Sequence, residues 1–131
     1  MYKRHNYGSG APWEETVGYS RVVRMGNVVE VSGTVAVDDA GTVVGAGNLY
    51  LQTRFILKKI EKALAEAGAS LDAVVRTRMF VTDINSWEAA GRAHGEVFGH
   101  IRPCTTMVEV RALIEPMCLI EIEATAILPQ P

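Results

Sequence analysis

The sequence predicts one α+β domain, in which a single sheet carries two helices on one face. Three observations lead to this class: a length of 131 residues with 48% apolar residues, several short β-rich runs, and two stretches of helical periodicity. A chain of this length suits one modest core. The predicted order is β-β-(β)-α-β-α-β-β, and consecutive helices usually cover the same face of such a sheet. The other face is then left open.

The beginning of the chain is predicted to be a flexible arm, residues 1–12, followed by one folded domain, residues 13–131. The arm is rich in Gly and polar residues, a composition typical of loosely held termini. Trp13 is the first residue expected to be anchored. Two β-rich runs follow at 19–24 and 28–32, and the Gly and Asn between them favour a hairpin.

The strongest helical pattern lies between Asn48 and Ala67. Apolar residues recur there at intervals of three and four, and most Lys and Glu residues take the other positions. Gly68 follows directly, as is typical of a helix C-terminus. We therefore expect a long helix over 48–67 with one face against the sheet.

A second, shorter helix is expected to end near Phe98. Asn85 or Ser86 is the expected N-cap, with Glu88 completing a capping box. His94 falls on the predicted buried face, where a hydrogen-bonded histidine at the seam between helix and sheet is expected rather than a base. The residues expected to be buried are Trp87, Ala90, His94 or Gly91, Val97 and Phe98.

The later β-rich runs, at 74–82, 105–110 and 119–128, divide into two rows because side chains alternate across a strand. Ile120, Ile122, Ala124 and Ala126 form a wholly apolar row in the last run. This row is expected to meet the helices. The mixed rows expected on the open face are Val74, Arg76, Arg78 and Phe80; Thr105, Met107 and Glu109; and Leu119, Glu121, Glu123, Thr125 and Ile127.

The composition of the open face predicts an oligomer. A solvated face would carry mostly polar residues, whereas this one interleaves Met107, Phe80 and Ile127 with glutamates and arginines. Such a surface resembles an interface that contains ion pairs, and a large uncovered apolar patch favours association. We expect a closed homo-oligomer with small-molecule pockets where its subunits meet.

Several classes of function are not indicated. The net charge is −2 and the basic residues form no stripe, which argues against nucleic acid as a partner. Cys104 and Cys118 form no CxxC pair, and no metal-binding or nucleotide-binding pattern occurs, so no metal or cofactor is predicted. No secretory leader or long apolar segment is present, so we expect a cytoplasmic protein without membrane contact.

Five segments of the chain carry a joint pattern: VGYSR at 17–21, VSG at 31–33, MFVTDIN at 79–85, RPCTTMVEV at 102–110 and IEIEA at 120–124. Together they resemble the YjgF family, also called the Rid or reactive intermediate deaminase family. They run in the family's order over nearly all of the chain beyond residue 12. This resemblance implies a chorismate-mutase-like α+β fold and a homotrimer whose sheets form an inner barrel. It also implies three ligand clefts between subunits.

The resemblance also implies a reaction and a set of site residues. Archetypal members hydrolyse 2-imino acids, such as 2-iminobutanoate and 2-iminopropanoate, to 2-oxo acids and ammonia. Glu123 matches the catalytic glutamate, and the backbone carbonyl of Met107 is expected to help position the attacking water. Tyr19, Gly33 and Asn85 match residues of the substrate pocket. The archetypal substrate-binding arginine lies two residues after the proline of its loop, and here that position is Thr105.

The threonine at the arginine position leaves alternatives open. Arg78 or Arg102 supplies the positive charge for the substrate, or Thr105 and Thr106 bind a neutral or differently shaped ligand. The function that the resemblance implies is accordingly an imine or enamine deaminase that uses Glu123 and a water, with a non-catalytic ligand-binding trimer as the alternative. A ribonuclease or translation inhibitor ranks last, because RNA cleavage needs paired acid–base groups and phosphate-binding cations.

Overall fold

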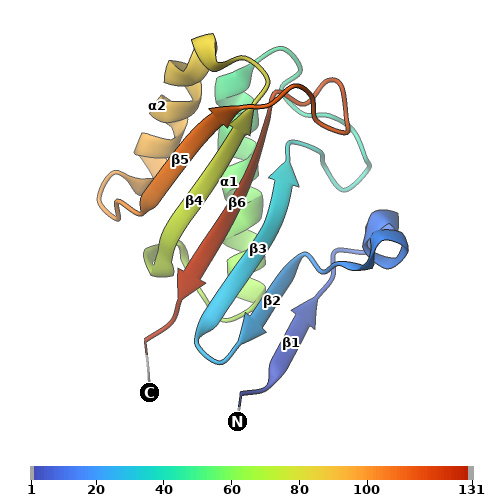
Figure 1. Ribbon diagram of the computed structural model, residues 1–131, viewed down its shortest axis with the longest axis vertical. Coiled ribbons are helices and arrows are strands. Elements are labelled where there is room, and N and C mark those ends of the chain that lie inside the picture. Colours follow the sequence, from blue (N-terminus) through green and yellow to red (C-terminus); the bar gives the residue numbers. More distant parts are fainter. Residues whose placement is uncertain (1, 130–131) are drawn as a thin grey trace.

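Six strands form one sheet, and the last strand of the chain lies at its centre (Figure 1). The order across the sheet is β1-β2-β3-β6-β4-β5, in a computed structural model that describes residues 2–129. Residue 1 of the expected arm and residues 130–131 of the expected domain lie outside the described residues. The strands are β1 (Arg4–Tyr7), β2 (Val22–Met25), β3 (Val28–Val35), β4 (Val74–Val81), β5 (Cys104–Glu109) and β6 (Ile120–Ile127).

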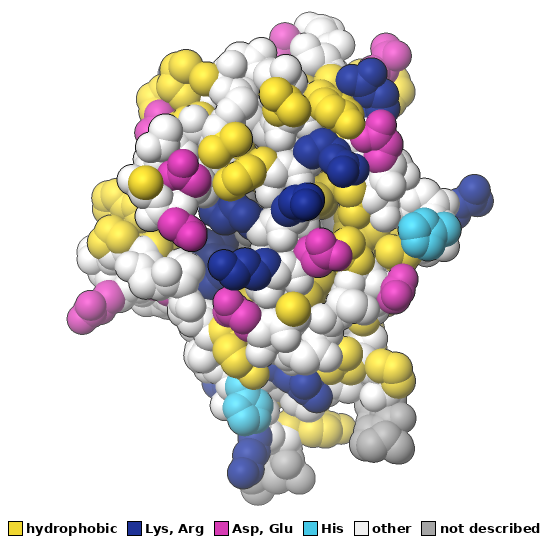
Figure 2. Space-filling view, turned by 180° about the vertical axis from the view of Figure 1, so that it is seen from behind, with side chains coloured by type: hydrophobic (Ala, Val, Ile, Leu, Met, Phe, Trp, Pro, Cys, Tyr) yellow, Lys and Arg dark blue, Asp and Glu magenta, His cyan; other side chains and the backbone are white. Residues whose placement is uncertain are grey.

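Two α-helices lie on one side of this sheet, as predicted (Figure 1). Helix α1 spans Leu49–Glu66, and the Asn48 side chain accepts a hydrogen bond from the Leu51 N–H at its start. Gly68, at φ 81°, ends it in the left-handed conformation that favours glycine. Helix α2 spans Trp87–Phe98. Seen from behind, acidic and basic side chains are interspersed on the helix-covered side (Figure 2).

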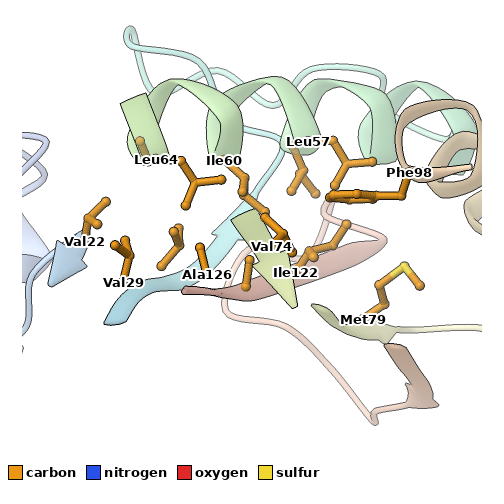
Figure 3. Close-up of a cluster of buried hydrophobic side chains, with 14 of the residues drawn as sticks. Val22, Val29, Leu57, Ile60, Leu64, Val74, Met79, Phe98, Ile122 and Ala126 are labelled. Carbon is orange, nitrogen blue, oxygen red and sulfur yellow. The ribbon is translucent and has the colours of Figure 1, made fainter. Parts of the chain in front are cut away.

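The hydrophobic core fills the space between the helices and the sheet (Figure 3). Leu57, Ile60 and Leu64 of α1 and Phe98 of α2 point toward the sheet. These side chains pack against buried residues of the sheet, which include the predicted apolar row of β6. Those four β6 residues, Ile120, Ile122, Ala124 and Ala126, are at most 1% exposed. The division of β6 into two faces is therefore confirmed.

The predicted faces of two other strands are wrong in part. A bulge between Val74 and Arg76 turns Val74 toward the core and leaves Val75 41% exposed on the open face. In β5, Thr105 pairs with buried Thr77 and Met107 with buried Met79, so these side chains and Glu109 face the helices. The error arose because β5 is an edge strand whose two rows are equally mixed.

The N-terminal segment and the start of α2 also differ from expectation. Residues 4–7 were expected to belong to a loose arm, yet they form β1, which pairs with β2. Trp13, the expected anchor of the arm, is 60% exposed, and Trp87, which was expected to be buried, is 52% exposed. A 3-10 turn, Ile84–Ser86, precedes α2, and the Asp83 carboxylate caps this turn by accepting a hydrogen bond from the Asn85 N–H. Ser86, one of the two predicted candidates, is the N-cap residue of α2, but its side chain makes no capping hydrogen bond.

Candidate functional site

The open face of the central strand carries two glutamates, one of which meets an arginine. Arg78 of β4 lies directly across from Glu123 of β6, and Arg78 Nη1 is 3.6 Å from Glu123 Oε1. The two side chains are 47% and 36% exposed. A pair as exposed as this contributes only about 0–1 kcal/mol to stability. Either partner is therefore available to a charged ligand.

On its other side, Glu123 faces an irregularity in β3. Val31 pairs with Ala124 and Thr34 with Ile122, so Ser32 and Gly33 together oppose the single residue Glu123. This β-bulge breaks the ladder and redirects the backbone of β3 beside the carboxylate. Irregular pairing of this kind is often found next to functional sites.

Arg21, the residue directly before β2, contacts the bulge in β3. Its Nη1 donates to the Gly33 carbonyl at 2.7 Å and to the Thr34 Oγ1 at 3.3 Å. The same guanidinium lies 5.8 Å from the centre of the Tyr19 ring, within the range of a cation–π contact. Tyr19 is thus linked to Gly33 through Arg21.

Glu121 lies against the bulge and is half-buried. A Cβ atom on residue 33 would lie 2.5 Å from Glu121 Oε2, so a larger residue there would require this carboxylate to move. Burial raises the pKa of Glu121, Arg21 opposes that shift, and Glu123 adds to it. The two glutamates of β6 therefore lie in different electrostatic surroundings, one half-buried and the other opposite Arg78.

The predicted site residues fall into two groups. Gly33, Arg78 and Glu123 are neighbours at the centre of the sheet, and Tyr19 is connected to Gly33 through Arg21. Thr106 belongs to the open face, since Arg76 Nη1 donates to its Oγ1 at 3.3 Å.

The remaining predicted residues lie elsewhere in the chain. Met107 packs against the core, and exposed Asn85 belongs to the turn before α2. Exposed Arg102, at φ 57°, donates from Nε to the Gly99 carbonyl at the end of α2. Of the two proposed replacements for the archetypal arginine, Arg78 is therefore the one beside Glu123.

Thr105 faces the helices, where it ends a chain of hydrogen bonds. Its Oγ1 lies 2.7 Å from Thr77 Oγ1, which in turn lies 2.9 Å from His94 Nε2. Thr77 is fully buried and His94 is 9% exposed. The predicted hydrogen-bonded histidine at the seam is thus confirmed.

Sequence reasoning missed the contribution of Arg21 and the position of Glu121 over Gly33. The signal for Arg21 was its place two residues after Tyr19, on a segment already singled out. Its contact with residues 32–34 depends on the bulge, which a pattern of period two does not reveal.

A single chain does not enclose this site. Two surface hollows, of about 400 and 360 Å³, are lined by residues around Tyr7 and around Ala69, away from Glu123. Residues 2–129 contain no group of three or more His, Cys, Asp or Glu side chains placed to hold a metal ion. Within the same residues, none of the helices has the length and apolar character needed to cross a membrane.

Comparison with known proteins identifies the family. Residues 11–128 match the family model described as Endoribonuclease L-PSP. The chain belongs to this family, the YjgF/Rid family. A crystal structure of a Mycobacterium tuberculosis member of the YjgF/YER057c/UK114 family is 48% identical. The alignment covers 96% of this chain and 100% of that one, with a TM-score of 0.87.

Two further members of the YjgF/Rid family are similar to this chain, and one of them is named for an activity. The 3-aminoacrylate deaminase RutC of Acinetobacter baylyi is 34% identical over 82% of this chain and 85% of its own length. A conserved Rid-family protein of unknown function from Yersinia pestis is 29% identical, with a TM-score of 0.83 over 96% of this chain and all of that one. The family therefore includes a protein named as a deaminase.

Proposed function

We propose that this protein is a Rid-type deaminase that hydrolyses small imines or enamines to carbonyl compounds and ammonia in the cytoplasm. The observation that carries the proposal is the Arg78–Glu123 pair on the open face, opposite the bulge at Ser32 and Gly33. The relative named 3-aminoacrylate deaminase supports the same class of reaction.

Each half of the ion pair has a separate task in this reaction. The guanidinium of Arg78 suits a substrate carboxylate, which it binds through two parallel hydrogen bonds. Binding there releases Glu123, which takes a proton from a water as the water oxygen bonds to the imine carbon. Glu123 passes this proton to the imine nitrogen, which gives a carbinolamine and restores the carboxylate. A second proton moves from the carbinol O–H to the nitrogen through Glu123, the C–N bond breaks, and ammonia leaves as the C=O bond forms.

The site is proposed to be completed by a second subunit of a homotrimer whose open faces form an inner barrel. Five large apolar side chains on that face are between 38% and 47% exposed in the single chain. They are interleaved with Glu30, Arg76 and Arg78, as in an interface that contains ion pairs. The five are Met25, Val28, Val75, Val108 and Ile127.

The test couples the protein to a threonine dehydratase, whose product is an enamine in equilibrium with 2-iminobutanoate. We expect faster release of 2-oxobutanoate and less trapping of the imine by semicarbazide. The Acinetobacter deaminase serves as positive control, with 3-aminoacrylate as a second substrate. Absence of acceleration with both substrates, under conditions where that relative is active, rules out the deaminase proposal.

The variant Glu123→Gln keeps the shape of the side chain and removes the base. We expect the rate to fall by about 100-fold or more, the usual range for loss of a general base. Glu30→Gln is the matched control, because Glu30 lies on the same face and accepts a hydrogen bond from Thr125. Equal activity of Glu123→Gln and wild type removes Glu123 from the mechanism.

A ligand-binding trimer without turnover is the second candidate, and the threonine at position 105 favours it. In that case 2-oxobutanoate binds to wild type and to Glu123→Gln with similar affinity, and neither accelerates hydrolysis. The ribonuclease activity in the family's name has less support here. His94 is buried against the sheet, whereas His5 and His100 are exposed on β1 and after α2, so the three do not form an acid–base pair.

A further inference from the structure

The larger of the two surface hollows lies at the β1 edge of the sheet and has a volume of about 400 Å³. Helices α1 and α2 lie behind β3, β6 and β4, and β1 lies outside the area that they cover (Figure 1). The hollow is therefore open to solvent, and its volume is within the range of small-molecule sites. The residues that line it are Tyr2, Lys3, His5, Tyr7, Arg24 and Gly26.

The hollow is on the helix-covered side of the sheet, opposite the side that carries the Arg78–Glu123 pair. In the antiparallel ladder His5 pairs with Arg24 and Tyr7 pairs with Val22, and directly opposed residues share a face. Val22 is fully buried in the core, and Tyr7 packs against that core. The hollow is therefore separate from the candidate site.

Positive charge is concentrated in this hollow. Lys3 and His5 are exposed and Arg24 is half-buried, and within residues 2–129 no Asp or Glu lines the hollow. Arg24 is held in place, because its Nε donates to the Gly26 carbonyl at 3.1 Å and its Nη1 to the Ala67 carbonyl at 2.8 Å. A guanidinium has five N–H donors, more than these two carbonyls require. The chain has a net charge of −2, so the hollow differs in sign from the chain as a whole.

Tyr2 adds a flat aromatic surface beside these basic groups. A Cβ atom on residue 26 would lie 2.7 Å from Tyr2 Cδ1 and 3.1 Å from its Cε1 and Cγ, so the ring lies over the Cα of Gly26. Gly26 has φ 63°, a conformation that favours glycine. Tyr2 is 68% exposed, which leaves ring surface on which a second aromatic ring can stack.

We propose that this hollow binds a small aromatic phosphate ester. Lysine and arginine are well suited to bind phosphate, and a phosphate ester offers three acceptor oxygens to the donors of Lys3, His5 and Arg24. A carboxylate offers only two. The aromatic ring of the ester stacks on Tyr2. The site is a second one, and the inference does not depend on the proposed deaminase activity.

The first test measures the dissociation constants of phenyl phosphate and inorganic phosphate by NMR titration of the intact protein. The ionic strength is about 0.15 M, at which long-range attraction between exposed charges is screened. We expect saturable binding of phenyl phosphate, with shifted amide signals in residues 3–7 and 24–26, and weaker binding of inorganic phosphate. Absence of saturable phenyl phosphate binding overturns the proposal.

The double variant Lys3→Gln/His5→Gln should bind phenyl phosphate at least tenfold more weakly, because hydrogen bonds to a charged group are lost. Arg4→Gln is the matched control. It removes a charge from the same strand, but Arg4 pairs with exposed Met25 on the open face, so we expect wild-type affinity. Equal affinity of the double variant and wild type overturns the proposal.

The variant Tyr2→Leu separates the contribution of the ring from that of the phosphate. It keeps an apolar side chain beside Gly26 and removes the aromatic surface. Phenyl phosphate should bind about fivefold more weakly, whereas the affinity for inorganic phosphate should not change. Unchanged affinity for phenyl phosphate overturns the assignment of an aromatic ester.

The outcomes for this site and for the deaminase can be told apart. Glu123→Gln should bind phenyl phosphate as tightly as wild type, because Glu123 lies on the other side of the sheet. Loss of binding in Glu123→Gln overturns the proposed location. Binding of phenyl phosphate by wild type that is lost in Lys3→Gln/His5→Gln, without any imine hydrolysis, supports this site and rejects the deaminase.

Discussion

The Arg78–Glu123 pair has two arrangements in the proposed mechanism, one without substrate and one with it. At 3.6 Å, and with both side chains more than a third exposed, the ion pair adds little to folding. In the proposed mechanism a substrate carboxylate takes the place of the Glu123 carboxylate beside Arg78. Arg78 would then bind the substrate and, in its absence, restrain the proposed base.

The variant Arg78→Gln tests this exchange. We expect KM for an anionic imine to rise about tenfold or more, because a charge-assisted hydrogen bond is worth roughly 1.5–3 kcal/mol. Arg78→Lys should restore part of the loss, since it keeps the charge without the planar fork. Arg76→Gln, two residues away on the same strand, is the control. Equal KM values for Arg78→Gln and wild type would contradict the assignment of Arg78.

Gly33 and Glu121 should behave as a coupled pair. In Gly33→Ala the new methyl group meets the Glu121 carboxylate, and such overpacking costs about 1–3 kcal/mol. In a Glu121→Ala background the same substitution should cost clearly less, because the clash has gone. Urea unfolding of the four proteins in this cycle measures the coupling. Additive effects would show that the close contact is not maintained in solution.

His94 predicts a pH dependence of stability. Burial lowers the pKa of His94, so between its folded pKa and the unfolded value near 6.5 only the unfolded chain binds the extra proton. The free energy of unfolding therefore rises with pH up to about 6.5 and loses this contribution as the pH falls through the folded value. His94→Gln should flatten this part of the profile, measured by urea unfolding between pH 4.5 and 8. His100→Gln, which leaves the buried imidazole in place, should not.

At the scale of elements, regular patterns predicted the fold well. The helix expected at 48–67 is α1, Leu49–Glu66, because its long amphipathic repeat and capping residues act locally. The two faces of β6 were also predicted, because one row is wholly apolar. From that division alone, Glu123 and Arg78 could be assigned to the same face. Their pairing as direct neighbours required the sheet order.

The errors at this scale have a common physical origin. A bulge adds a residue to one strand and reverses every face assignment beyond it, as at Val74 and Val75. The bulge at Ser32 and Gly33 is likewise absent from the alternating pattern, so the hydrogen bond from Arg21 to Gly33 could not be predicted from the sequence. In β5, Thr105 and Met107 alternate with Thr106 and Val108, so composition could not decide which row faces the helices.

At the scale of the whole molecule, one side of the sheet is covered by helices and the other side is exposed. The helices cover one side, and Arg54 and Glu96 link α1 to α2 across its outer surface at 3.8 Å. The other side has a half-exposed apolar and charged surface with the candidate site at its centre. In the proposed trimer, neighbouring subunits cover this second side of the sheet.

Val108→Lys should therefore disrupt the oligomer. A lysine introduced on the open face places an unpaired charge in the proposed interface, which is strongly unfavourable. We expect sedimentation analysis to show a smaller species than for wild type at the same concentration. Leu51→Lys is the matched control, because Leu51 is 48% exposed at the start of α1, outside the open face. An unchanged mass for Val108→Lys would place the interface elsewhere.

The central position of β6 has a consequence for synthesis of the protein. A nascent chain that has not yet delivered residues 120–127 leaves β3 and β4 without the strand that joins them. Two open strand edges are then exposed together, and such edges are prone to pair with other chains. Glu123 belongs to the same strand that closes the sheet. A chain without residues 120–127 therefore lacks both the proposed catalytic carboxylate and the strand that completes the sheet.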